Sequence, residues 1–454
     1  MIKTIDPSSG LLITEYNYYS SKRVFSIIDD VHSSSLEWRE ENLAFRIECI
    51  SRLGNLLEKN REELATLVTK EMGKLYSESL LEIDKSISLC SYLSHIAADG
   101  INLNNRVNFS NLEVSCAPIG IVFGIMPWNF PVWQVMRYAL PSLAIGNGVL
   151  LKHAPNVTGV SLYLENLLER CGFNKNIFRS LIIPVDMVHD IIAYDKVQAV
   201  SFTGSDKVGS LIASTAGKYI KKTVLELGGS DPFIILSDAD LDVAFKAAFD
   251  ARMQNMGQSC IAGKRFILEE KIYDAFIEYI SDRISRIEFG SLFDSKTSIA
   301  PLSTDSGLNR INRQVQVSLS GGASVISPLK DIDSNGFYYT PKIITGADRS
   351  MPALSQELFG PVFSVVSTSK DGIVRLANDT EYGLGASLWT NDKELANSIS
   401  HRIDSGMVFI NEITRSSPEI PFGGIKKSGY GRELSALGLY EFANIKSIYS
   451  SYSK

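Results

Sequence analysis

Mostly apolar runs and helix-like segments alternate along the middle of the chain, and no other feature limits the possible folds as strongly. Ile121–Met126 and Val197–Phe202 are two such runs, and each is followed by a turn and then a helical pattern. A strand without a polar face is buried on both sides. Strands that alternate with helices form a mainly parallel sheet. The sequence therefore predicts an α/β fold with a doubly wound sheet.

The composition argues against two classes of partner. With 454 residues, 44% of them hydrophobic and 21% charged, the chain is long enough for two or three globular domains. Its net charge of −6 argues against nucleic acid as the partner. The most apolar run, Ala117–Trp128, is interrupted by prolines and glycines and is too short to span a bilayer. We therefore expect neither a nucleic-acid nor a membrane partner.

The cysteines and histidines are scattered along the chain. The five cysteines include no C-x-x-C pair, and the five histidines are equally dispersed. This pattern favours reduced thiols over a disulfide framework, and no metal site is visible in it. The first residues also lack the apolar core of a signal peptide. We expect a cytoplasmic protein without a bound metal.

One cysteine, Cys260, lies in a polar stretch that reads N-M-G-Q-S-C-I-A-G-K-R (residues 255–265). Inert structural cysteines are normally packed among aliphatic side chains, whereas a polar turn can expose a thiol and stabilise its thiolate. Cys260 is therefore a candidate nucleophile. An ordinary loop cysteine is the alternative at this point.

Two further polar side chains lie at strand ends. Asn129 stands between two prolines in P-W-N-F-P, directly after Ile121–Met126, so the backbone around its amide is restricted. Glu226 lies in an apolar strand that ends in two glycines, and burial raises a carboxylate's pKa toward the range of a general base. The alternatives are a plain turn asparagine and a paired strand-end glutamate.

A third strand end has the features of a phosphate site. Val197–Phe202 runs into T-G-S (residues 203–205), and a helix from about residue 206 to 216 is predicted to follow. The free N–H groups and the dipole of such a helix N-terminus favour an anion, although the sequence is not G-x-G-x-x-G. Lys152 closes the apolar strand Val149–Lys152, where it either extends its amine to solvent or binds an anion.

The two ends of the chain have other patterns. The first hundred residues are predicted to be mostly helical, with apolar side chains at helical spacing across Leu43–Leu81. Residues 101–116 are polar and strand-like, and Tyr440–Tyr452 alternates like an edge strand. An exposed edge strand needs a pairing partner, which favours an oligomer.

Six motifs occur in one order along the chain: P-W-N-F-P, S-F-T-G-S, L-E-L-G-G, G-Q-S-C, E-L-F-G-P and P-F-G-G-I-K-K-S-G-Y-G-R-E. In this order they resemble the aldehyde dehydrogenase superfamily, and the resemblance extends from about Phe25 to the end. It implies a homodimer or homotetramer whose subunit has three parts. These are a Rossmann-type NAD(P)-binding domain (residues 1–99 and 119–227), an α/β catalytic domain (228–437) and a small β oligomerisation extension (100–118 and 438–454).

By resemblance, Cys260 is the nucleophile that adds to an aldehyde. The Asn129 amide and the Cys260 backbone N–H match the oxyanion site for the tetrahedral adduct. Hydride then passes to a nicotinamide and leaves a thioester, and Glu226 matches the base that activates water to hydrolyse it. Because Glu226 is present, a CoA-acylating activity is not expected.

The resemblance also implies NADP or NAD as the cofactor. The matching residues are Trp128, Lys152, Pro155, Gly204, Ser205, Val208, Gly228, Glu357 and Phe359. Members that prefer NAD often carry a glutamate three positions after the lysine matched by Lys152, and this chain has Pro155 there. A carboxylate would repel a 2′-phosphate and proline does not. We therefore expect NADP to be accepted at least as well as NAD.

Within the superfamily the chain is most similar to bacterial succinate-semialdehyde dehydrogenases. Arg137 and Ser416 match side chains that contact the far carboxylate of the substrate, and Gln254 stands where many members have a second arginine. Ala262 replaces a second cysteine, so no disulfide switch is expected. The alternative for Arg137 is an ion pair at a helix surface. For the whole chain, the alternatives are a broad aldehyde dehydrogenase for uncharged aldehydes and a catalytically silent binding protein.

Overall fold

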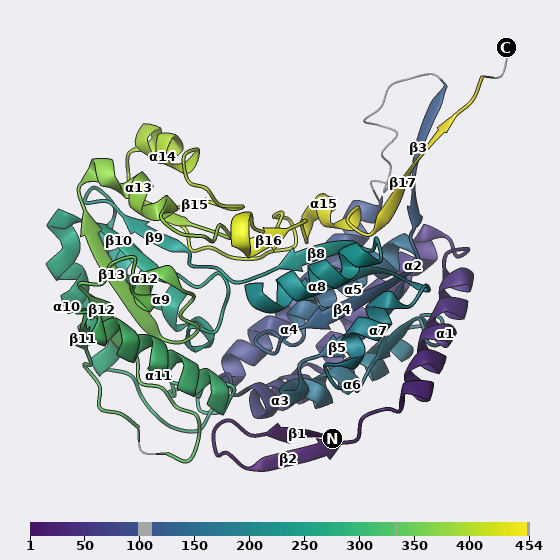
Figure 1. The fold of residues 1–454 in the computed structure, drawn as a ribbon, viewed down its shortest axis with the longest axis horizontal. Helices are drawn as coiled ribbons and strands as arrows, with labels where there is room; N and C mark the ends of the chain where they lie inside the picture. The colour runs from purple at the N-terminus through teal and green to yellow at the C-terminus, as the bar shows by residue number, and fades with distance from the viewer. Residues whose placement is uncertain (99–110, 333, 452–454) are drawn as a thin grey trace.

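The computed structural model describes residues 1–98, 111–332 and 334–451. The chain forms two lobes, each built on its own sheet (Figure 1). The first sheet has the order β16-β8-β7-β4-β5-β6, with every strand parallel except β16, which runs antiparallel to β8. Its strands are β4 Ile121–Met126, β5 Gly148–His153, β6 Phe178–Ser180, β7 Val197–Thr203, β8 Lys222–Glu226 and β16 Gly429–Tyr430.

Helices cover both faces of this first sheet, so the predicted doubly wound α/β arrangement is confirmed. Alternate residues of one strand show it: Val149 and Leu151 pack with one set of helices, whereas Leu150 packs with the other. One set comprises α2 Leu43–Lys59, α3 Arg61–Met72, α4 Tyr76–Ala98, α5 Trp133–Ile145 and α6 Thr158–Glu169. The opposite set comprises α1 Ser21–Trp38, α7 Met187–Ala193 and α8 Asp206–Lys218.

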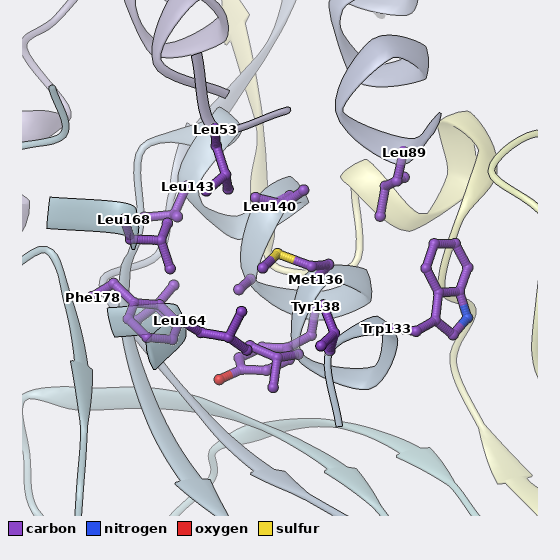
Figure 2. Close-up of a cluster of buried hydrophobic side chains, with 14 of the residues drawn as sticks. Leu53, Leu89, Trp133, Met136, Tyr138, Leu140, Leu143, Leu164, Leu168 and Phe178 are labelled. Carbon is purple, nitrogen blue, oxygen red and sulfur yellow. The ribbon is translucent and has the colours of Figure 1, made fainter. Parts of the chain in front are cut away.

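The largest buried cluster is centred on α5, which is buried along its whole length. Figure 2 shows side chains of this helix, among them Met136 and Leu140, gathered with Leu53 of α2 and Leu89 of α4. Burial on all sides needs a helix that is apolar all round, and W-Q-V-M-R-Y-A-L-P-S-L-A-I has only three residues with strongly polar side chains. One of them is Arg137, whose placement is described below.

The second lobe is built on a seven-stranded sheet with the order β11-β12-β13-β10-β9-β14-β15. Only β11 is antiparallel to its neighbour. The strands are β9 Pro232–Ile235, β10 Arg265–Glu269, β11 Ser324–Ile326, β12 Lys342–Thr345, β13 Val362–Thr368, β14 Ser387–Trp389 and β15 Phe409–Ile410. Its helices are α9 Leu241–Met253, α10 Tyr273–Ser285, α11 Asp305–Ser320, α12 Pro352–Ser355, α13 Ile373–Asn378 and α14 Lys393–Ser400. The chain enters this lobe between Glu226 and Pro232 and returns to the first sheet at β16.

A two-stranded arm extends away from both lobes (Figure 1). It pairs β3 Leu112–Pro118 with β17 Ala443–Tyr449 in antiparallel register, next to the short helix α15 Ser435–Leu439. The predicted tail strand is therefore present, although Tyr452, its last expected residue, lies outside the described residues, as do residues 100–110 and 452–454 of the expected extension.

The amino-terminal part contains an element that the helical prediction missed. The chain begins with a hairpin, β1 Ile2–Ile5 and β2 Leu12–Tyr16, before the helices start. These strands are too short to carry a clear periodicity, and β1 contacts the short 3₁₀ turn Pro155–Val157, which is distant in sequence. The helical segment across Leu43–Leu81 is present but divided into three helices. No helix among the described residues is long and apolar enough to cross a membrane.

Candidate active site

The turn that carries Cys260 begins at a kinked helix end. Helix α9 stops at Met253, and the following 3₁₀ turn contains two residues in the left-handed region, Asn255 (φ 52°) and Met256 (φ 53°). Such backbone costs about 1–3 kcal/mol per non-glycine residue and persists only where neighbours hold it. Glu78 Oε1 accepts the N–H of Asn255 at 2.6 Å. The approach to Cys260 is thereby held in one conformation.

Lys264 holds the other side of the turn. Its buried ammonium donates to the carbonyl oxygens of Ser259, Cys260 and Ala262 at 3.0, 2.7 and 3.3 Å. Charge-assisted hydrogen bonds of this kind are about twice as strong as neutral ones, so the backbone of Cys260 has a defined orientation. Lys264 Nζ also lies 3.6 Å from Glu357 Oε1.

The Cys260 thiol is half-buried and protonated in the free protein. Burial raises the pKa of this thiol to about 12, while the positive charges of Arg137 and Lys264 act in the opposite direction. The polar turn therefore does not stabilise a thiolate as the sequence suggested, because desolvation of the sulfur outweighs the two cations.

Asn129 is fixed beside this turn. Its side-chain Nδ2 donates to the carbonyl oxygen of Gln258 at 2.9 Å, and its own carbonyl accepts a bond from Asn255 Nδ2 at 2.9 Å. An amide nitrogen carries two protons, so one remains for another acceptor. Because Asn129 and Cys260 line the same cavity, that proton is available to an oxygen atom bound beside the thiol.

The cavity shared by Cys260 and Asn129, called the α11 cavity here, has a volume of about 420 Å³. Six of the nine predicted cofactor residues also line it: Trp128, Gly204, Ser205, Gly228, Glu357 and Phe359. They arrive from the carboxyl ends of β4, β7 and β8, at one edge of the parallel sheet, and from the second lobe. Ligands of doubly wound sheets bind at this edge.

The residues of the α11 cavity fit a dinucleotide. Ser205 caps α8, and its Oγ accepts the N–H of Val208 at 3.4 Å, so a helix N-terminus faces the cavity edge. The rings of Trp128 and Phe359 meet edge-on at 5.8 Å between centroids. A Cβ on Gly228 would lie 2.7 Å from Glu357 Oε2, so a glycine here leaves that carboxylate its space. An anion site, aromatic faces and a carboxylate are what phosphates, a planar base and a ribose require.

The lining residues of this cavity that were not identified from the sequence include a group at the start of one helix. Thr304, Ser306, Gly307 and Arg310 belong to the start of α11, Asp305–Ser320, in the second lobe. The only local signal is the cap, in which Thr304 Oγ1 accepts the N–H of Gly307 at 3.1 Å. A helix cap by itself identifies a helix start and not a ligand site.

Three predicted cofactor residues do not line the α11 cavity. Lys152 is buried at the end of β5, and Pro155 begins the 3₁₀ turn that follows. Burial lowers the pKa of the Lys152 amine. Val208 is exposed on the first turn of α8. Lys152 lies at the carboxyl end of β5, Pro155 follows that end and Val208 follows β7, so all three lie at the edge of the sheet where the cavity residues also lie.

Glu226, at the end of β8, is also outside both cavities that Cys260 lines. Its carboxyl group is buried, and neither oxygen has a hydrogen-bond partner among the described residues. A Cβ on Gly423 would lie 2.8 Å from Glu226 Oε1, so the carboxyl group faces Gly423. Burial, followed by the negative charge of Glu433, raises the pKa of Glu226 well above its usual range. Burial therefore favours the neutral form of this carboxyl group in this conformation.

A second cavity, called the α5 cavity here, is also lined by Cys260 and has a volume of about 310 Å³. Cys260 lines it together with the three predicted substrate residues, Arg137, Gln254 and Ser416. The polar lining also includes Lys85 and Arg415, and the apolar lining is formed by Phe130, Trp133, Ile261, Ile413 and Phe422. The structure thus brings the predicted substrate residues together around the sulfur.

Arg137 forms an ion pair, as the alternative from the sequence proposed, but in the interior and not at a helix surface. The guanidinium is 2% exposed, its Nε lies 2.8 Å from Glu433 Oε2, and it stacks over the ring of Phe422 at 4.5 Å. Helix α5 is buried on all sides, which places the residue in the interior, where a guanidinium needs a carboxylate. No group of three or more His, Cys, Asp or Glu side chains within the described ranges is placed to hold a metal ion.

Comparison with known proteins gives consistent results. A family model described as "Aldehyde dehydrogenase family" matches residues 1–448. The chain is 39% identical over 459 residues to a "Succinate-semialdehyde dehydrogenase [NADP(+)]" of Mycolicibacterium paratuberculosis, covering 100% of this chain and 97% of the relative. It is 38% identical to a "Probable succinate-semialdehyde dehydrogenase [NADP(+)]" of Synechocystis sp., covering 99% of each. A solved structure of succinic semialdehyde dehydrogenase from Streptococcus pyogenes with NADP+ superposes with a TM-score of 0.96 at 34% identity, covering 100% of both chains.

Proposed function

The chain belongs to the aldehyde dehydrogenase family, and on this premise we propose that it oxidises succinic semialdehyde to succinate with NADP or NAD as the acceptor. The observation that carries the proposal is that Cys260 lines two cavities at once. The α11 cavity has the features of a dinucleotide site. The α5 cavity presents Arg137 and the Ser416 hydroxyl, which suit a carboxylate at the far end of a short aldehyde.

The proposed chemistry begins when the Cys260 thiol releases its proton to solvent and its sulfur adds to the aldehyde carbon, whose C=O π electrons move to the oxygen. The free Asn129 Nδ2 proton and the Cys260 backbone N–H stabilise the resulting oxyanion. When bound, NADP or NAD supplies the hydride acceptor. For the hydrolysis of the thioester, the Glu226 carboxyl group turns from Gly423 toward the sulfur and releases its proton to solvent. The carboxylate then takes a proton from a water molecule, whose oxygen adds to the thioester carbon, and the C–S bond breaks to release the acid and the Cys260 sulfur.

The proposed cofactor site uses the residues around the α11 cavity. Ser205 and the N-terminus of α8 bind phosphate, Glu357 binds a ribose, and Trp128 and Phe359 contact flat faces. Pro155 supports NADP, because it offers no carboxylate against a 2′-phosphate and the buried Lys152 lies nearby in sequence. NADP also appears in the names of the relatives described above.

Two further statements about the whole protein belong to the proposal. The enzyme is a homodimer or homotetramer joined through the arm of β3 and β17, whose exposed apolar side chains support this role. It works in the cytoplasm, which is supported by its five cysteines all being free thiols.

The test is the initial rate of reduced-nicotinamide formation with succinic semialdehyde and with butanal, each with NADP and NAD. Cys260→Ala protein is the blank. We expect a strong preference for the semialdehyde, and a smaller preference in Arg137→Lys. The lysine keeps a positive charge opposite Glu433 but cannot bind a substrate carboxylate through two parallel N–H groups. Equal or faster turnover of butanal would instead make the protein a general aldehyde dehydrogenase.

A further inference from the structure

The α5 cavity contains a lysine that the sequence did not single out. Lys85 lies near the middle of α4, is partly buried and lines the cavity together with Cys260. Its ammonium Nζ donates to Ser416 Oγ at 2.6 Å and lies over the ring of Trp133, 4.5 Å from the centroid. These contacts fix the ammonium at the cavity wall.

The neighbouring cations already have carboxylate partners. Arg137 pairs with Glu433 at 2.8 Å, and the exposed Arg415 pairs with Glu412 at 3.6 Å. Lys85 makes no ion pair with any carboxylate in the part of the chain that the structure describes. Removing a cation from water without a counter-charge is costly. A carboxylate that enters the cavity therefore gains more from Lys85 than from Arg137, which already has a carboxylate partner.

Ser416 is prepared to donate to the same group. Its Oγ accepts hydrogen bonds from Lys85 Nζ at 2.6 Å and from Trp133 Nε1 at 3.0 Å. A hydroxyl has two acceptor lone pairs and one proton. With both lone pairs occupied, the proton of Ser416 is left to donate, and a carboxylate only accepts. An ammonium and a hydroxyl donor thus lie side by side in the α5 cavity.

We propose that Lys85, with Ser416, binds the far carboxylate of the aldehyde substrate and is the main determinant of preference for an acid semialdehyde. This rests on the proposed function, because it assigns a residue to the substrate's second charge. The Ser416 hydroxyl supports Lys85 and completes the site. Arg137 contributes a positive charge that Glu433 partly cancels.

The proposal has a pH signature. Burial lowers the pKa of Lys85 to about 7; Arg137 and Lys74 act in the same direction, whereas Glu82 and Cys260 act against it. In the free enzyme the ammonium therefore loses its proton as the pH rises above about 7. A bound carboxylate favours the protonated form. We expect the KM for the semialdehyde to be flat below pH 7 and to rise above it by up to about tenfold per pH unit.

The test compares Lys85→Met, Lys85→Arg and the wild type, with Lys59→Met, an exposed lysine at the end of α2, as the matched control. We expect Lys85→Met to raise the KM for succinic semialdehyde about ten- to a hundredfold, which is the worth of a hydrogen bond to a charged group. Its kcat should fall by much less, and the preference over butanal should shrink accordingly. Lys85→Arg should keep most of the affinity and lose the rise of KM above pH 7.

The outcomes separate this proposal from the one on which it rests. A wild type that prefers the semialdehyde, together with a Lys85→Met protein of unchanged KM, overturns the role of Lys85 and leaves the proposed function intact. A wild type without that preference overturns both. The pH dependence of the wild-type KM needs no variant, so it decides the matter even if Lys85→Met does not fold; a KM that is constant from pH 6 to pH 9 contradicts the proposal.

Discussion

Burial favours the neutral form of two side chains, Cys260 and Glu226, that the proposed reaction uses in ionised form. The pKa of the thiol is raised to about 12, and that of the Glu226 carboxyl well above its usual range. Both groups lie near Arg137, whose charge acts against burial without overcoming it. A neutral Cys260 thiol reacts slowly with electrophiles, because the thiolate is the nucleophile. Formation of the thiolate therefore depends on bound ligands or on side-chain movement.

The thiol can be tested by alkylation of the free protein. Because a thiolate reacts and a thiol does not, the rate of carbamidomethylation of Cys260 by iodoacetamide should rise about tenfold per pH unit between pH 7 and 10, without a plateau. Mass spectrometry of the Cys260 peptide measures the rate, with Cys260→Ser protein as the blank. A plateau reached below pH 9 would show a stabilised thiolate and contradict this expectation.

Asn129 is the second residue whose effect can be predicted. Its Nδ2 has one proton bound to Gln258 and one free. Loss of a single oxyanion donor costs about 3–4 kcal/mol in other enzymes, so Asn129→Ala should lower kcat by roughly a hundred- to a thousandfold while the protein remains folded. Steady-state kinetics with the preferred aldehyde measures this, and unchanged turnover refutes the role.

At the scale of elements, helix α4 packs in the first lobe and also supplies Lys85 to the lining of the α5 cavity. Besides Lys85 it carries Glu82, whose Oε2 pairs with the buried Lys74 at 2.6 Å. The other oxygen, Oε1, accepts the N–H groups of Val132 and Trp133 at 2.7 and 3.0 Å, which caps the start of α5. One carboxylate thus joins two helices and a buried cation.

Breaking this connection should destabilise the protein. Glu82→Gln leaves Lys74 as an unpaired buried charge, which costs about 3–5 kcal/mol. Urea unfolding measures the loss, with Glu58→Gln on the exposed face of α2 as a control that should change little. Adding Lys74→Met to Glu82→Gln should restore part of the stability, because no unpaired charge remains. A Glu82→Gln protein as stable as the control contradicts the assignment.

At the scale of the whole molecule, the arm of β3 and β17 extends away from both lobes of the monomer (Figure 1). Ile445 and Ile448 of β17 are 55% and 42% exposed, on a two-stranded sheet that leaves both lobes (Figure 1). An isolated hairpin is marginally stable in water, and exposed apolar strands tend to pair with other chains. The arm is therefore where subunits are expected to meet.

Sedimentation velocity tests the role of the arm. Ile445→Asp places a charge in the proposed interface and should shift the protein to a smaller species than the wild type. Ile220→Asp, at a side chain that is 93% exposed on the body, should leave the assembly unchanged. Equal assembly of Ile445→Asp and wild type would contradict an interface on β17.

The sequence by itself determined the family, the parallel α/β fold and the candidate residues around Cys260. These depend on local information, because strand and helix periodicity and short motifs such as P-W-N-F-P and G-Q-S-C are read over a few neighbouring positions. All nine predicted cofactor residues were named without knowledge of long-range contacts, and six of them line the α11 cavity. Their actual convergence on one cavity follows from the shared edge of the sheet.

Only the tertiary structure decided the protonation of the site residues and the partners of its charged side chains. Whether Cys260 and Glu226 are ionised depends on desolvation and on groups far away in sequence, and Arg137 became a buried partner of Glu433 because α5 is enclosed on all sides. Lys85 meets Ser416 across 331 positions of the chain. Electrostatic energies are set by distance and burial in space, and the linear order of residues specifies neither until the chain has folded.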